Sequence, residues 1–138
     1  SGGEPLFHQD FEELLEKLFG DNFEVAVETR GAKAFPFEKF PQVWVTFSPK
    51  LHATGYLKGR LSPTFWTHSK EIKVVISQST DWEIYEQLLD QAAQLGLPIY
   101  LQPEWSKKLE TIPLILQILR QKPDWKISVQ LHKYLKLP

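Results

Sequence analysis

The apolar residues of this chain switch several times between a helical spacing and the alternation typical of strands. The first helical stretch runs from Phe11 to Phe19, where apolar residues recur at intervals of three and four. Asp10 and Glu13 form a capping-box pattern at its start, and Gly20 follows it directly. This pattern predicts a helix that begins after Asp10 and stops at Gly20.

Short apolar segments with alternating or continuous apolar residues predict strands. The predicted strands are 23–29, 43–47, 72–76, 97–101 and 127–131. The third is almost wholly apolar in its second half, as expected of a strand covered on both faces. Residues 51–70 show no period and contain many turn formers, so we expect a long loop there.

Two further helices are predicted after the third strand. The first has a capping-box pattern at Thr80 and Glu83 and stops at Gly96, and its expected buried face is Ile84, Leu88, Ala92 and Leu95. The second has Ile112, Leu116 and Leu119 on one face. Pro113 is tolerated there only in the first turn, because proline lacks the N–H of a helix interior.

Helices that alternate with strands predict a parallel sheet and an α/β fold. The 138 residues suit a single domain over 1–138. The predicted order starts with a helix, so the strand that would lead into Gly2 and Gly3 is not in this sequence. We therefore expect a chain that lacks the N-terminal strands of its sheet.

Composition narrows the classes of function. The net charge of −1 gives no electrostatic footprint for nucleic acid or an acidic membrane. Neither a signal peptide nor a membrane span is recognisable, so we expect a cytoplasmic location. The absence of cysteine excludes disulfides, thiol catalysis and cysteine-held iron–sulfur clusters from these residues.

Polar motifs follow the apolar core of several predicted strands. They are Thr29-Arg30-Gly31, Ser48-Pro49-Lys50, Gln102-Pro103-Glu104 and Gln130-Leu131-His132-Lys133, and Ser1-Gly2-Gly3 would occupy the same place after an absent strand. Ligands of parallel α/β folds bind at the carboxyl ends of the strands. Together the motifs therefore predict one shared site, although each alone is also an ordinary turn sequence.

Other residue types point more weakly to a site. The four histidines, His8, His52, His68 and His132, lack the spacing of a metal site. Glu12, Glu13 and Glu16 suit a solvated helix face. The aromatic residues at 35, 37, 40, 44, 65 and 66 can stack on a planar ligand, but such residues more often cover a sheet face.

Taken in chain order, the motifs resemble those of the 7-carboxy-7-deazaguanine synthases. The motifs are Ser1-Gly2-Gly3-Glu4-Pro5, Glu28-Thr29-Arg30-Gly31, Ser48-Pro49-Lys50, Leu101-Gln102-Pro103-Glu104 and Val129-Gln130-Leu131-His132-Lys133. The 7-carboxy-7-deazaguanine synthases are radical S-adenosylmethionine (SAM) enzymes of queuosine and deazapurine biosynthesis. The resemblance covers the whole chain and about the later two thirds of the family's length, without its cysteine motif.

The resemblance implies a partial (β/α) barrel with parallel strands and a homodimer. In the family, a 4Fe-4S cluster held by three N-terminal cysteines cleaves SAM to a deoxyadenosyl radical. The radical takes hydrogen from 6-carboxy-5,6,7,8-tetrahydropterin. A ring contraction assisted by Mg²⁺ then releases ammonia and yields 7-carboxy-7-deazaguanine.

The resemblance also implies roles for individual residues. Substrate contacts are implied for the hydroxyl of Ser1 and the free carboxylate of Pro138. No catalytic or metal-binding residue is implied within this chain. Arg30 stands where the family often has a small or amide residue, and Leu131 stands where threonine is usual. SAM contacts are implied for Gly3, Ser48, Pro49, Lys50, Gln102, Pro103, Glu104 and Trp105.

Two other readings remain open at this point. The chain is compatible with another radical SAM enzyme, such as an activase that makes a glycyl radical on a partner protein. It is also compatible with an inactive structural fragment. Because it has no cysteine, we expect no radical activity from these residues alone.

Overall fold

Parallel strand pairing organises the chain. The structure is a computed structural model that describes residues 3–51, 63–79 and 81–136. The strand order is β1-β2-β3-β4-β5, so each strand neighbours the next one along the chain. The predicted α/β fold with parallel strands is confirmed. The strands are β1 (Ala26–Thr29), β2 (Trp44–Phe47), β3 (Ser69–Ile76), β4 (Ile99–Pro103) and β5 (Lys126–Ile127).

The chain divides into two compact units, residues 1–71 and 72–138, with the boundary inside β3. The first unit contains η1 (Pro5–Phe7), α1 (Phe11–Gly20), η2 (Phe37–Lys39) and α2 (Pro63–His68). The second contains α3 (Asp81–Gln94), α4 (Lys108–Gln121) and α5 (Leu131–Tyr134). A single domain over 1–138 stays a prediction. None of the helices in the described ranges is long and apolar enough to cross a bilayer.

Helix α1 has the predicted bounds but not the predicted cap. Phe11 and Leu15 are its buried residues, as its spacing suggests. The side chain of Asp10 makes no capping hydrogen bond; its backbone carbonyl instead accepts the N–H of Leu14 at 2.9 Å. The left-handed residue after the helix is Asn22 at φ 60°, not Gly20. A short polar side chain tolerates this conformation.

An aromatic cluster forms the core of the first unit. Phe35 lies 5.3 Å from Phe11, 4.8 Å from Phe37 and 5.9 Å from Phe40 between ring centroids. All four rings are buried. These pairs contribute roughly 0.5–1.5 kcal/mol each beyond the burial of their surface. The aromatic residues therefore serve mainly as core, although Trp44 remains half exposed.

The expected loop over 51–70 is wrong from residue 63 onward. Residues 63–68 form α2, and β3 begins at Ser69, three residues before the predicted strand. Phe65 is fully buried, and its ring lies 5.5 Å from that of Phe47 and 6.0 Å from that of Phe37. Aromatic contacts between residues distant in sequence therefore order α2. The local spacing of apolar residues does not reveal such contacts. Residues 52–62 lie outside the described residues.

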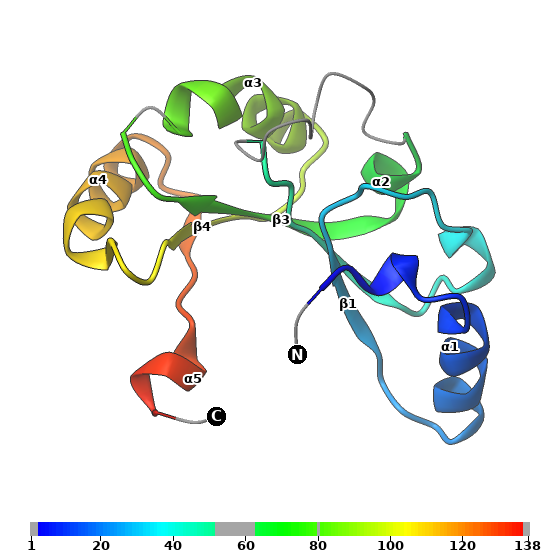
Figure 1. The fold of residues 1–138 in the computed structure, drawn as a ribbon. Helices are drawn as coiled ribbons and strands as arrows, with labels where there is room; N and C mark the ends of the chain where they lie inside the picture. The colour runs from blue at the N-terminus through cyan, green and yellow to red at the C-terminus, as the bar shows by residue number, and fades with distance from the viewer. Residues whose placement is uncertain (1–2, 52–62, 80, 137–138) are drawn as a thin grey trace. The chain divides into compact units, whose positions relative to one another are not determined.

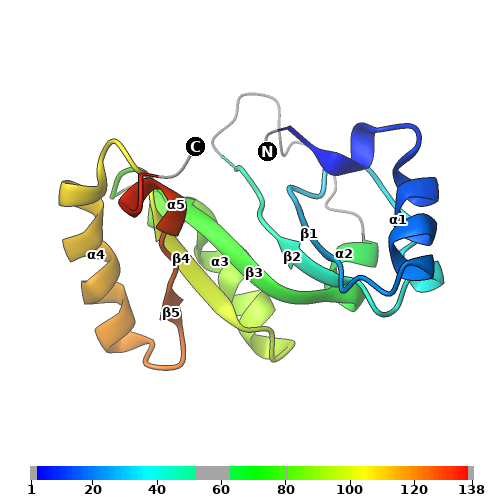
Figure 2. The ribbon, with the colours of Figure 1, turned by 90° about the horizontal axis from the view of Figure 1, so that it is seen from below.

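In the second unit, helices α3 and α4 pack on β4. Figures 1 and 2 show α3 on one side of β3 and β4, with α5 on the other side near the carboxyl end of β4. Buried Ile72, Val74 and Ile76 alternate along β3, beside Ile99 and Leu101 of β4. The side chains between them along β3 are less buried, so the two faces of this strand are covered unequally.

The predicted buried faces of α3 and α4 are displaced. Of the face predicted for α3, Ala92 is buried, but Ile84 and Leu95 are about half exposed, and Tyr85 and Leu89 are buried instead. In α4 the buried residues are Thr111, Ile115 and Ile118. Each helix has apolar residues at adjacent positions, so two neighbouring rows of side chains both have the helical spacing. Packing on β4 decides which of the two rows is buried. Thr80, half of the predicted capping box of α3, lies outside the described residues.

The ends of these helices confirm one expectation and correct another. Gly96 has φ 70°, its N–H donates to Ala93, and the N–H of Leu97 donates to Ala92, which is the hydrogen-bond pattern of a Schellman cap. Pro113, however, lies in the second turn of α4, because the helix begins at Lys108. The missing N–H of Pro113 removes one helical hydrogen bond.

The fifth strand is shorter than predicted. It covers Lys126 and Ile127, and residues 131–134 are helical rather than extended. Ile127, Val129 and Leu131, whose alternation predicted the strand, are 38%, 48% and 60% exposed. An alternation of three apolar residues is too short to separate a strand from a turn that leads into a helix.

Gly31 supplies a direct test of how the first unit packs. Its φ is 76°, and a Cβ at this position would lie 2.6 Å from Cε2 of the buried Phe47 ring. We expect Gly31→Ala to destabilise the protein by about 2–4 kcal/mol, because strain and overpacking combine. Urea unfolding measures this change.

Gly20→Ala is the matched control. Gly20 lies in α1, and a Cβ there would meet nothing within 4 Å. Its effect is expected to stay within about 1 kcal/mol of zero. Equal stabilities for the two variants would contradict the close contact between Gly31 and Phe47.

Candidate functional site

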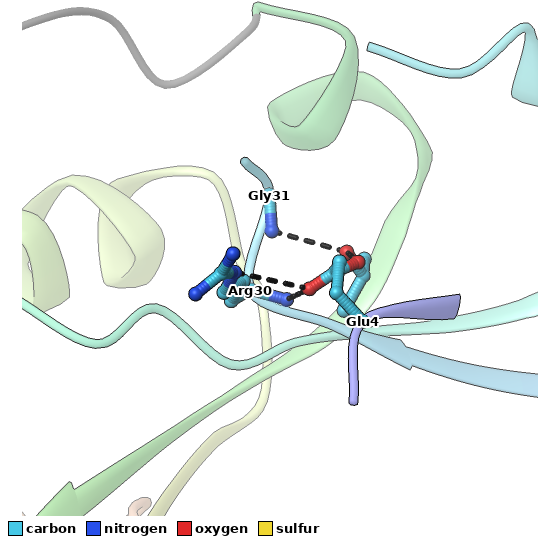
Figure 3. A network of polar contacts seen from close by, with 4 residues as sticks. Glu4, Arg30 and Gly31 are labelled. Atoms are coloured by element: carbon cyan, nitrogen blue, oxygen red, sulfur yellow. Dashed lines mark hydrogen bonds and ion pairs between the residues drawn. The ribbon is translucent and has the colours of Figure 1, made fainter. Parts of the chain in front are cut away.

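A buried carboxylate joins the Gly-Gly-Glu-Pro loop to the end of β1. Oε1 of Glu4 accepts the hydroxyl hydrogen of Thr29, and Oε2 accepts the backbone N–H of Arg30 at 2.9 Å. The Thr29 oxygen in turn accepts the N–H of Gly31 at 3.1 Å. Figure 3 shows Arg30 in contact with Glu4, and Gly31 bonded within the same network. We refer to Glu4, Thr29, Arg30 and Gly31 as the Glu4 clip.

The side chain of Arg30 belongs to the same network. Its Nε lies 3.6 Å from Oε2 of Glu4, and its guanidinium carbon lies 5.5 Å from the centroid of the Phe7 ring. The side chain is 35% exposed, against 6% for Glu4. The arginine that departs from the resembled family therefore contacts the loop that follows Gly3, rather than only solvent.

The Ser48-Pro49-Lys50 motif follows β2 beside the Glu4 clip. The N–H of Ser48 donates to the carbonyl of Thr29 at 2.7 Å, which continues the parallel pairing of β1 with β2. Ser48 and Pro49 are buried and Lys50 is exposed. The backbone of Ser48 is thus fixed by strand pairing, and the Lys50 side chain is exposed at the end of the strand.

Gly3 has the backbone freedom expected of a ligand-binding loop. Its φ is 92°, in the region that favours glycine, and a Cβ there would meet no atom within 4 Å. The residue is exposed, so its peptide groups are accessible. Ser1, the other predicted ligand residue of this loop, lies outside the described residues, as does Pro138.

In the second unit, the end of β4 carries the Gln102-Pro103-Glu104 motif. Gln102 and Pro103 are the last two residues of β4 and are buried. The Ser128 hydroxyl donates to Oε1 of Gln102 at 3.5 Å, and the N–H of Glu104 donates to the carbonyl of Ile76 at 2.8 Å. The end of β4 is thereby hydrogen-bonded to the end of β3 and to the segment that follows β5.

The carboxylate of Glu104 orders the turn into α4. Its Oε2 accepts the Ser106 hydroxyl at 2.5 Å and the N–H of Lys107 at 3.0 Å. The hydrogen bond from the Ser106 side chain is the largest cause that holds the pKa of Glu104 below its ordinary value. The backbone of Ser106 and the charge of Lys133 act in the same direction. The turn into α4 therefore favours the charged form of Glu104.

Trp105 packs against the helix that ends the described chain. Its ring lies 4.9 Å from the ring of Tyr134, edge to face. Nζ of Lys108 is 4.1 Å and Nζ of Lys133 is 5.6 Å from the Trp105 centroid. Trp105, predicted to contact SAM, thus also anchors α5, and His132 lies on that short exposed helix.

Polar side chains also lie within the strands of each unit. In the first unit, the Thr46 hydroxyl donates to Oε1 of Glu71 at 2.7 Å. In the second, Lys126 pairs in register with Tyr100, and its Nζ lies 5.6 Å from the ring centroid. Sequence reasoning missed these residues because it looked for polar groups only after the strands. Their signal is the alternation of polar with buried apolar residues within a strand.

The residues that the structure describes do not fit a metal centre. No group of three histidine, cysteine, aspartate or glutamate side chains among them is arranged to hold an ion. The chain has no cysteine to hold a 4Fe-4S cluster. The described ends of β1 and β2 offer backbone polar groups and an exposed cation, which suit an organic ligand.

The pKa of Glu104 supplies a test of this turn. We expect Ser106→Ala to raise that pKa toward the ordinary 4.5, because the main hydrogen bond is lost. Glu104 in the folded protein favours its charged form, so its contribution to stability is present above the unfolded-state pKa and is lost as the pH falls through the folded pKa. Carboxyl ¹³C NMR titration measures the change. Ser106→Thr keeps the hydroxyl and should keep the low pKa; an unchanged pKa in Ser106→Ala would contradict the assignment.

Comparison with known proteins finds relatives that share one name. No protein-family model matches the chain. A curated relative, the 7-carboxy-7-deazaguanine synthase of Flavobacterium psychrophilum, is 34% identical over 140 aligned residues, which cover 100% of this chain and 60% of the relative. The chain thus spans about three fifths of the length of the curated relatives it matches.

Solved structures agree with the sequence relationship. The crystal structure of QueE from Escherichia coli matches with a TM-score of 0.64 and 28% identity, over 94% of this chain and 54% of that one. SuiB from Streptococcus suis, in a crystal structure bound to S-adenosylmethionine, matches with a TM-score of 0.61 at 13% identity, over 94% and 38%. The second match shows the shared fold. The chain is therefore similar along its whole length to 7-carboxy-7-deazaguanine synthases, the family that its motifs resemble.

Proposed function

We propose that the protein containing this chain is a 7-carboxy-7-deazaguanine synthase. It converts 6-carboxy-5,6,7,8-tetrahydropterin to 7-carboxy-7-deazaguanine with release of ammonia, in queuosine or deazapurine biosynthesis. The observation that carries the proposal is the match of the whole chain to proteins of this name at up to 34% identity. The fold supports it, since polar motifs follow parallel strands in each unit.

SAM is the cofactor that these motifs suit. The backbone at Gly3 and the Ser48-Pro49-Lys50 motif offer the polar groups and the cation that its amino-acid end requires. Gln102, Pro103, Glu104 and Trp105 supply further contacts in this proposal. That a structural neighbour is a SAM-bound protein supports the choice of cofactor. When bound, SAM supplies the group that takes hydrogen from the substrate.

Two other cofactors of the proposed reaction find no ligand set in the described residues. A 4Fe-4S cluster requires cysteines, which are absent from the chain, and no three histidine, aspartate or glutamate side chains among the described residues are arranged to hold Mg²⁺. In this proposal both are held outside residues 1–138. The chain contributes ligand binding and orientation, and by itself it is inactive.

The pterin contacts in this proposal involve Ser1 and Pro138, the two residues to which the resemblance assigns the substrate. The hydroxyl of Ser1 can form a hydrogen bond with the pterin. Pro138 supplies the second contact. The proposal includes a cytoplasmic homodimer that binds neither nucleic acid nor membrane.

The test uses the full-length protein that contains these residues, with its cluster reconstituted. Wild-type protein is expected to form 7-carboxy-7-deazaguanine from the pterin and SAM, detected by chromatography and mass spectrometry. Absence of this product, with cluster and SAM present, would overturn the proposed function. A glycyl radical formed on a partner protein would instead favour an activase.

Lys50 supplies a residue-level test. Lys50→Ala is expected to weaken SAM binding about tenfold, because a charge-assisted hydrogen bond is lost. Lys17→Ala, which removes an exposed cation of α1, is the control and should leave the affinity unchanged. Isothermal titration calorimetry measures both. Equal affinities for wild type and Lys50→Ala would remove Lys50 from the SAM site.

A further inference from the structure

We propose that Glu4 is a positioning residue, which holds the Gly3 backbone for the amino-acid end of SAM without touching that ligand itself. The inference rests on the proposed function, because it names how the same site is held. The sequence pattern of the Gly-Gly-Glu-Pro loop assigned no role to the side chain of Glu4.

The first argument is that the Glu4 carboxylate already has its hydrogen bonds within the protein. One oxygen accepts from the Thr29 hydroxyl and the other from the N–H of Arg30, with Nε of Arg30 at 3.6 Å (Figure 3). The side chain is only 6% exposed. A ligand ammonium would have to displace these donors to reach the carboxylate.

The second argument is the fixed direction of the hydrogen bonds through Thr29. The hydroxyl accepts the N–H of Gly31, so its single hydrogen is left to donate to Glu4. Thr29 is 1% exposed, and its carbonyl accepts the N–H of Ser48 at 2.7 Å. Glu4 is thereby connected to both motifs that follow β1 and β2.

The third argument is the place of Glu4 in the chain. It directly follows Gly3, which has φ 92° here and, because glycine lacks a Cβ, can adopt many other backbone conformations. Arg30 also contacts both Glu4 and Phe7, so it holds the segment that follows Gly3. The network therefore fixes a loop that its own sequence leaves flexible, and such preorganisation strengthens binding by lowering the cost of ordering.

The geometry distinguishes a positioning role from direct charge recognition. In Glu4→Gln the amide oxygen can still accept from Arg30 N–H, and the amide nitrogen can donate to the second lone pair of the Thr29 oxygen, so only the hydroxyl hydrogen of Thr29 loses its partner. We therefore expect SAM to bind Glu4→Gln within about threefold of wild type. Glu4→Ala leaves the buried donors without partners, and we expect a loss on the order of tenfold or more in affinity.

Thr29 gives a matched pair of variants. Thr29→Val keeps the side-chain shape and removes the hydroxyl, so it should weaken SAM binding severalfold, between the two Glu4 variants. Thr29→Ser keeps the hydroxyl and should bind like wild type. The measurements are SAM affinity by calorimetry on the reconstituted full-length protein, and amide hydrogen exchange at Arg30 and Gly31.

The outcomes separate the possibilities. Two results overturn the proposal: Glu4→Gln binding SAM as weakly as Glu4→Ala, which would show that the ligand meets the charge, and Glu4→Ala binding like wild type. Failure of the wild-type protein to bind SAM overturns the proposed function and, with it, the ligand named here. Hydrogen exchange still tests the clip in that case, because rapid exchange at Arg30 and Gly31 in wild type would show that it does not form.

Discussion

The contacts of one buried carboxylate hold together the polar segments at the ends of β1 and β2. Glu4 accepts hydrogen bonds from Thr29 and Arg30, and Thr29 is also bonded to Gly31 and Ser48. A buried anion is costly unless donors surround it, so these donors and the carboxylate depend on one another. Because the loop contains Gly3, whose backbone favours no single direction, removal of the carboxylate would leave the strand ends in place but not the loop.

The hydrophobic core packs directly against the polar segments at the ends of β1 and β2. Phe47, the last residue of β2, fills the space beside Gly31, and only a residue without Cβ fits there. The Phe47 ring is in turn held by Phe65 of α2, in a stacked pair. The second unit repeats the arrangement with other residues, since buried Gln102 and the Glu104 turn lie at the end of a strand packed under α3 and α4. In both units, close packing positions polar groups that local sequence alone would leave mobile.

Sequence periodicity predicted the kind of element better than its contacts. The helix at 11–20 and the cap at Gly96 were correct because spacing, glycine and local hydrogen bonds act within a few residues. The buried faces of α3 and α4 were displaced, since Tyr85 stands next to Ile84 and either stripe is apolar enough. Helix α2 was missed because the burial of Phe65 depends on Phe37 and Phe47. The site followed the same rule: the motifs at Ser48 and Gln102 were visible as strand-end sequences, whereas the partners of Glu4 were not.

The sequence by itself determined the alternation of helices and strands, the placement of polar motifs after strands and the resemblance to a radical SAM family. Each of these depends on residue type and on spacing over short distances. Only the tertiary structure decided that Glu4 is bonded to Thr29 and Arg30, that Trp105 packs against Tyr134, and which helix faces are buried. These contacts join residues more than twenty positions apart, and the free energy of burying them depends on neighbours that no local pattern specifies.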